Sequence, residues 1–150
     1  MRPTLVIALL LLSACGPGDR LNGTIRDRAS LFFVEVQAQF LVDRLSLRYL
    51  DTRGGATQEP VRLTLPTAKA VTGVDVDLSK GVLVEHFSTR ETEAGLLVAE
   101  EPFPAVKEGV LKFTKVSTAR GQSVEGEFHL VFAGALDTLN GDFTAIVVPP

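Results

Sequence analysis

Hydrophobic and polar residues alternate with a period of two along most of the chain, which is the pattern of half-buried β-strands. In residues 31–42 the alternation gathers one set on a common face: Phe32, Val34, Val36, Ala38, Phe40 and Val42. The opposite face is polar in its middle. Residues 44–50 alternate again, with Leu45, Leu47 and Tyr49 on the apolar side. The two segments predict a hairpin, or one strand with a bulge around Asp43.

Shorter alternating or apolar segments follow, separated by turn residues. They are residues 61–65, which Pro60 and Pro66 bracket, and residues 74–78, 82–87, 96–99 and 110–116. Residues 51–55 and the pair Lys80-Gly81 have the composition of turns. Residues 67–70 and 91–95 could each form about one helical turn, but no segment has the spacing of a long amphipathic helix.

The last two predicted strands have the clearest alternation and share the spacing Gly-x-Phe. The first places Val124, Gly126, Phe128, Leu130 and Phe132 on one face, and the second places Leu139, Gly141, Phe143, Ala145 and Val147 on one face. An antiparallel hairpin would put both phenylalanines on the same buried surface. We expect the glycines to mark either bulges or points where strands approach closely.

Together these segments predict an all-β fold. Roughly eight to ten short strands with turns between them are typical of a single antiparallel β-sandwich or a partly closed β-barrel. We place this domain at residues 21–150.

The first twenty residues have a different character. Arg2 precedes an unbroken apolar run over residues 5–12, which is too short to span a bilayer but fits the core of a secretion signal. The run ends in Leu12-Ser13-Ala14-Cys15, which resembles the bacterial lipobox at all four positions. The resemblance implies a signal peptide at residues 1–14, diacylglycerol on the Cys15 thiol, and a tether at residues 15–20. The alternatives are an ordinary cleaved signal with a chance cysteine, or a buried N-terminal helix.

Composition narrows the range of functions. Removing Arg2 with the signal takes the net charge from −3 to −4, so a basic nucleic-acid surface is not expected. Cys15 is the only cysteine, which excludes a disulfide within the chain. Lipid on that thiol would also remove the best nucleophile. The chain has no tryptophan and one tyrosine, which lowers the expectation of a sugar-binding surface or an aromatic cage.

Candidate metal and catalytic residues are sparse. His86 and His129 stand on different predicted strands, and two histidines without a ligand cluster are more often surface or core groups than a zinc site. Oxygen-rich positions that could hold calcium are Asp75 and Asp77, and Asp137, Asn140 and Asp142 around the last turn. Aspartate and asparagine are also ordinary turn formers, and that interpretation is favoured. No Gly-x-Ser-x-Gly elbow or phosphate-binding glycine loop occurs. We therefore expect neither an enzyme nor a cofactor.

Arginines give the first half of the domain a local basic bias: Arg26, Arg28, Arg44, Arg48 and Arg53. Beside a membrane anchor they could meet anionic headgroups. A solvated face balanced by Asp27, Glu35, Asp43 and Asp51 is the favoured alternative.

The C-terminal hairpin, written as Gly-x-Phe and then Leu139-Asn140-Gly141-Asp142-Phe143-Thr144-Ala145, resembles small lipoproteins of high-GC Gram-negative bacteria such as myxobacteria. The resemblance covers about a fifth of the chain and carries over no catalytic residue. It implies a cell-envelope protein, and Gly16 after the cysteine favours the outer membrane by resemblance to enteric lipoprotein sorting. We expect a non-catalytic accessory module whose partners are membrane lipid and an envelope protein. The alternatives are a barrel binding an apolar ligand or lipid, and an envelope hydrolase.

Overall fold

The computed structural model describes residues 18–27, 30–92 and 95–150. The predicted signal peptide and Cys15 lie outside these residues. The strands are β1 (Arg20–Asn22), β2 (Glu35–Phe40), β3 (Arg44–Asp51), β4 (Gln58–Pro66), β5 (Asp75–Asp77), β6 (Leu83–Thr92), β7 (Gly95–Pro102), β8 (Val106–Lys115), β9 (Ser123–Phe132) and β10 (Thr138–Val148). Two 3-10 turns, η1 (Thr24–Asp27) and η2 (Thr67–Lys69), complete the described elements. The all-β prediction is confirmed.

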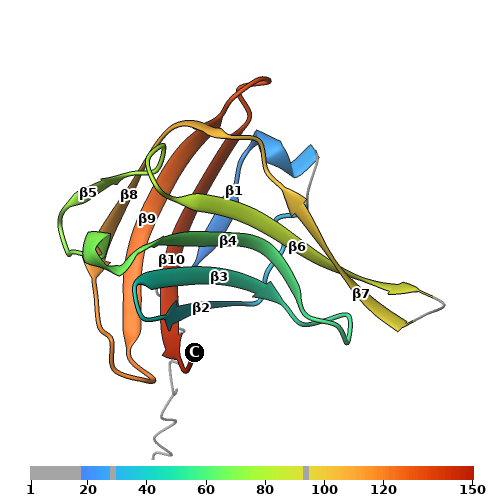
Figure 1. The fold of residues 1–150 in the computed structure, drawn as a ribbon, viewed down its shortest axis with the longest axis horizontal. Coiled ribbons are helices and arrows are strands. Elements are labelled where there is room, and N and C mark those ends of the chain that lie inside the picture. The colour runs from blue at the N-terminus through green and yellow to red at the C-terminus, as the bar shows by residue number, and fades with distance from the viewer. Residues whose placement is uncertain (1–17, 28–29, 93–94) are drawn as a thin grey trace, which may run out of the picture.

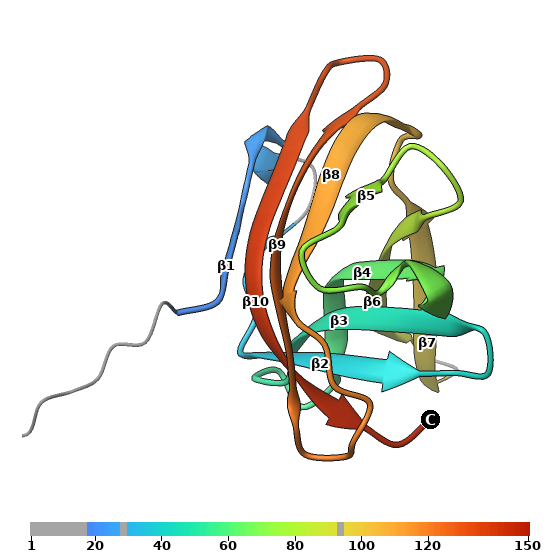
Figure 2. The same ribbon diagram turned by 90° about the vertical axis from the view of Figure 1, so that its left-hand side faces the viewer.

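All ten strands belong to one sheet, in the order β5-β8-β9-β10-β2-β3-β4-β6-β7, with β1 beside β10. The strand pairs are antiparallel except β10 and β2, where residues 146–148 run parallel to residues 37–39. At this junction the sheet curls, so that β8, β9 and β10 cross β2, β3 and β4 (Figure 1). Figure 2 shows the two halves facing each other. The result is a half-barrel, and the parallel pair is its one departure from the predicted antiparallel sheet.

The core fills the concave side of this curled sheet. The predicted apolar faces of residues 44–50, 61–65 and the last two strands all point into it. Tyr49, Phe113 and Phe132 are among its largest fully buried side chains. These strands follow the predicted alternation because a period of two leaves one face for the core and one for solvent.

The predicted strand over residues 31–42 is longer than the observed one. Val36 and Ala38 are buried in β2, but Phe32 and Val34 are 45 % and 47 % exposed, and Val42 is fully exposed in the turn before β3. The ladder between β2 and β3 ends at the pair of Glu35 and Leu50. Residues 31–34 therefore lie beyond the sheet, apart from a hydrogen bond that the Val34 amide donates to the Leu50 carbonyl (2.8 Å).

Two further differences concern short segments. The helical turn expected at residues 67–70 is present as η2, but the one expected at residues 91–95 is wrong. There Thr92 and Gly95 pair across the β6–β7 hairpin. The strand β1 was not predicted, and it begins at Arg20, the last residue assigned to the tether.

The Gly-x-Phe pairs have the predicted arrangement. In the β9–β10 ladder, Gly141 stands opposite Phe128 and Phe143 stands opposite Gly126. Both rings are buried. An added Cβ on Gly141 would lie only 2.4 Å from Phe128 Cε1, so each glycine leaves room for the ring across from it. Close approach, one of the two expected roles, is therefore confirmed at both glycines, and Gly126 also stands beside a change of register in the β8–β9 ladder.

Candidate functional site

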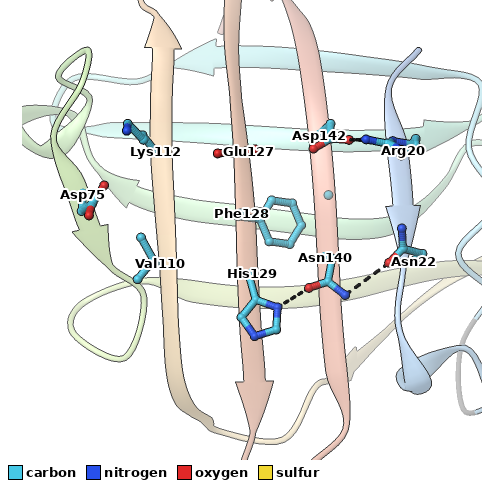
Figure 3. Close-up of a pocket in the computed structure, with 11 residues that line it drawn as sticks. Arg20, Asn22, Asp75, Val110, Lys112, Glu127, Phe128, His129, Asn140 and Asp142 are labelled. Atoms are coloured by element: carbon cyan, nitrogen blue, oxygen red, sulfur yellow. Dashed lines mark hydrogen bonds and ion pairs between the residues drawn. The ribbon is translucent and has the colours of Figure 1, made fainter. Parts of the chain in front are cut away.

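A shallow polar groove of about 440 Å³ crosses the outer face of the sheet half that contains β8, β9 and β10 (Figure 3). β1 forms one margin and β5 the other. Most of its lining comes from residues that alternate with the buried ones on these strands: Arg20, Asn22, Asp75, Val110, Lys112, Glu127, His129, Asn140 and Asp142. Phe128 and Gly141, from the core face, complete the lining. The groove is thus the solvent-facing counterpart of the core face.

Hydrogen bonds between neighbouring strands tie the groove together. His129 Nδ1 is hydrogen-bonded to the Asn140 side-chain oxygen, and Asn140 Nδ2 donates to Asn22 Oδ1 (3.2 Å). Beside them, Arg20 Nε donates to Asp142 Oδ2 (2.7 Å). Each of these pairs stands directly opposite in the ladder. The Nδ1 atom of the imidazole therefore has an amide oxygen as its partner.

Tyr49, on β3, packs against the core side of β9 and β10. Its hydroxyl donates to the Asp142 carbonyl (3.4 Å), and its ring makes edge-to-face contacts with Phe33 and Phe128. Burial raises the pKa of Tyr49 well above its ordinary value, and the negative charges of Asp19 and Asp142 add to the effect. The phenol therefore acts as a neutral core group.

The oxygen-rich positions do not converge on a cation site. Asn140 and Asp142 share the outer face of β10, but they are engaged by His129 and Arg20. Asp77 accepts hydrogen bonds from the Ser79 hydroxyl and amide and pairs with Lys80 (2.9 Å). These contacts lower the pKa of Asp77 to about 2. Within the described ranges, no group of three or more His, Cys, Asp or Glu side chains could hold a metal ion.

The two histidines lie far apart in the strand order, because His129 is on β9 and His86 is on β6. His86 Nδ1 is hydrogen-bonded to the Pro60 carbonyl (3.1 Å), and its ring packs on Phe103 with centroids 5.8 Å apart. His86 is therefore tied to the packing of β4 and β6, and the two imidazoles do not share a site.

A buried charge cluster was not predicted. Glu59 is almost fully buried and accepts from Arg48 Nε (3.1 Å) and from Arg62 Nε (2.7 Å), while the Arg62 guanidinium stacks on Phe87 at 4.0 Å. A change of register between β3 and β4 leaves two residues, Glu59 and Pro60, opposite Leu50 alone. This bulge turns Glu59 toward the face of the arginines. The proline, which cannot complete a ladder, was the available signal.

Two of the five arginines that give the first half its basic bias pair with carboxylates. Arg48 pairs with Glu59, and Arg53 Nε pairs with Asp51 Oδ1 at 3.0 Å. Asp51 is one of the carboxylates that we expected to balance the arginines. Glu59, which pairs with Arg48, was not expected to do so. The side chains of Arg26 and Arg28 lie outside those that the structure describes.

Comparisons of the chain with protein-family models, with curated proteins and with solved structures returned no match. In the described part of the chain, no helix has the length and apolar character that crossing a bilayer requires.

Proposed function

We propose that the protein is a cell-envelope lipoprotein, anchored by acyl chains on Cys15, whose β domain is a non-catalytic interaction module. The observation that carries the proposal is the motif Leu12-Ser13-Ala14-Cys15 at the chain's only cysteine, followed four residues later by Asp19 at the edge of the domain. Several acyl chains would hold such a protein on a membrane without a transmembrane helix. Gly16 after the cysteine favours the outer membrane.

The polar face supports a binding role over catalysis. The groove places its histidine, asparagines and one arginine in hydrogen bonds to each other, which leaves them organised for recognition rather than for proton transfer. The alternative of an apolar-ligand carrier would need space on the concave side of the sheet. In the described residues that side is occupied by side chains such as Tyr49, Phe113 and Phe132, which weighs against a carrier.

The anchor is tested by expressing the full chain in a Gram-negative host and measuring the mass of the protein in the membrane fraction. We expect cleavage before Cys15 and the added mass of acyl chains. Cys15→Ser should stay unprocessed and lose stable membrane association. Ser13→Ala is the matched control, because alanine also fits that lipobox position and should leave processing unchanged. Processing and membrane association that persist in Cys15→Ser would overturn the proposal.

The interaction role is tested by crosslinking in intact envelopes. We expect the wild-type protein to crosslink to an envelope protein, and the unanchored Cys15→Ser variant to lose that product. If wild-type protein on the membrane forms no such product, the anchor stands but the module has another role.

A further inference from the structure

Residues 31–34, with the sequence Leu-Phe-Phe-Val, lie beyond the sheet, and they alternate between side chains that pack on the core and side chains that are exposed. Phe33 is held at the core by its edge-to-face contact with Tyr49, whose ring centroid is 4.9 Å away. Its neighbours Phe32 and Val34 point outward and are 45 % and 47 % exposed. An aromatic and a branched side chain directed outward make a small apolar surface that stays partly exposed to solvent.

This apolar segment lies beside the point where the chain enters the domain. A hollow of about 580 Å³ is lined on one side by residues 19–22 and on the other by residues 31–34. Asp19 is fixed there, because its carboxylate accepts a hydrogen bond from the Thr144 amide (2.6 Å). Figure 2 shows β1 on one side of the molecule and the turn between β2 and β3 on the opposite side.

Two arginines flank this surface, one on the Phe32 ring and one in the lining of the hollow. The Arg53 guanidinium carbon lies 3.0 Å from the ring centroid of Phe32, and Arg20 lines the β1 side. Both arginines pair with aspartates, but both side chains are largely exposed. Apolar side chains flanked by arginine are the composition of surfaces that sit at a bilayer interface.

The length of the proposed tether limits how far this surface can lie from the membrane. Cys15 is four residues from Asp19, and a fully extended chain spans at most about 14 Å over that length. If Cys15 carries acyl chains, its backbone lies at the level of the lipid headgroups. Asp19, which lines the hollow, is then within about 14 Å of the bilayer surface, whichever way the domain turns.

We propose that residues 31–34, with Arg53 at their border, dock against the bilayer that holds the Cys15 acyl chains. The domain would then lie on the membrane with its β1 side down and its β2–β3 turn facing away. This inference rests on the proposed anchor, and it adds a second, non-covalent contact that fixes the orientation of the domain.

The test uses the absence of tryptophan from the chain. Phe32→Trp introduces one fluorophore on the proposed contact, and Val42→Trp introduces one at a fully exposed position in the β2–β3 turn as the matched control. Each full-length, lipidated variant is reconstituted in vesicles of anionic and zwitterionic phospholipid. In parallel vesicles, the lipids carry bromine on the upper acyl carbons. Val34→Trp repeats the measurement at a second position, and circular dichroism verifies that each variant is folded.

For Phe32→Trp we expect a blue-shifted emission in vesicles. In brominated vesicles we expect the tryptophan fluorescence intensity to fall by about half or more, because interfacial side chains insert about 5–10 Å into the bilayer. Val42→Trp should keep its emission and stay open to aqueous quenchers. An exposed tryptophan at position 32, or one shielded from water but not quenched by bromine, would overturn the inference. The second outcome would indicate a protein contact. Mass spectrometry of the same samples separates this result from failure of the anchor, because absence of acyl chains on Cys15 would refute the proposed function itself.

Discussion

The pairing of glycine with phenylalanine across β9 and β10 makes a specific prediction for Gly141→Ala. The added Cβ would lie 2.4 Å from Phe128 Cε1, 2.8 Å from Phe128 Cζ and 2.8 Å from the Tyr49 hydroxyl oxygen. Tyr49 is fully buried and Phe128 nearly so, so the added methyl group would have to displace packed rings. The backbone of Gly141 has no positive φ, so alanine is excluded by space and not by conformation.

The expected cost follows from two opposing effects. Forcing a methyl group into a packed core typically costs about 1–3 kcal/mol, because the neighbouring side chains must leave their preferred rotamers. Replacing glycine restricts the unfolded chain and returns about 0.4–1 kcal/mol. We therefore expect a net destabilisation of about 1–2 kcal/mol, which corresponds to a fall of several degrees in Tm for a domain of this size.

The measurement is urea and thermal denaturation followed by far-ultraviolet circular dichroism, since the only tyrosine is one of the groups displaced. Gly54→Ala is the matched control: a Cβ there meets nothing within 4 Å, and this variant should match the wild type or exceed it slightly. In a Phe128→Leu background the cost of Gly141→Ala should shrink by about 1 kcal/mol, because the clashing ring is gone. Equal stability of the two alanine variants, or an equal cost in both backgrounds, would refute the packing argument.

Three further predictions concern charged and titrating groups. Glu59→Gln should lower the free energy of unfolding in urea by about 1–2 kcal/mol, less than for a fully buried pair, because its arginine partners are 23 % and 27 % exposed and can turn to water. Burial raises the pKa of Tyr49, so the folded protein should show no tyrosinate absorbance at pH 10. Stability should fall as pH rises above 10, since only the unfolded state ionises there. The Asp77 carboxyl should titrate near pH 2 by NMR, and Ser79→Ala should move its pKa toward 3.8. Its contribution to stability is present above about pH 4 and is lost as pH falls toward 2.

The alternation of hydrophobic and polar residues predicted the strands well wherever one face of a strand is buried and the other is exposed to solvent. Residues 124–132 and 139–147 are examples, because a shift by one residue would have moved Phe128 or Phe143 from the core to solvent. The same rule misassigned residues 31–34, whose apolar positions continue the pattern of β2. Periodicity reports which residues share a face, but whether a partner strand extends far enough to pair with them depends on where β3 ends.

The candidate site was less accessible to sequence reasoning for a related reason. Asn140, Asp142 and His129 could be placed on the outward faces of their strands from the pattern alone. Their hydrogen bonds depend on register, which sets Asn140 between His129 on one side and Asn22 on the other. The strand that carries Asn22 is only three residues long, too short to show alternation. Glu59 was hidden by a one-residue change of register that a strict period of two does not allow.

The strand β10 connects the two halves of the curled sheet and also pairs with β1, the first strand of the domain. Its early residues lie between β9 and β1, whereas residues 146–148 pair with β2. The contact that joins the two halves of the sheet therefore involves three residues on each strand, separated by more than one hundred positions in the chain. The proposed tether would join the domain at β1, which pairs with β10 alone and lies outside that junction. A pull on this tether would thus reach the three-residue ladder of β1 before it reaches the junction of β10 and β2.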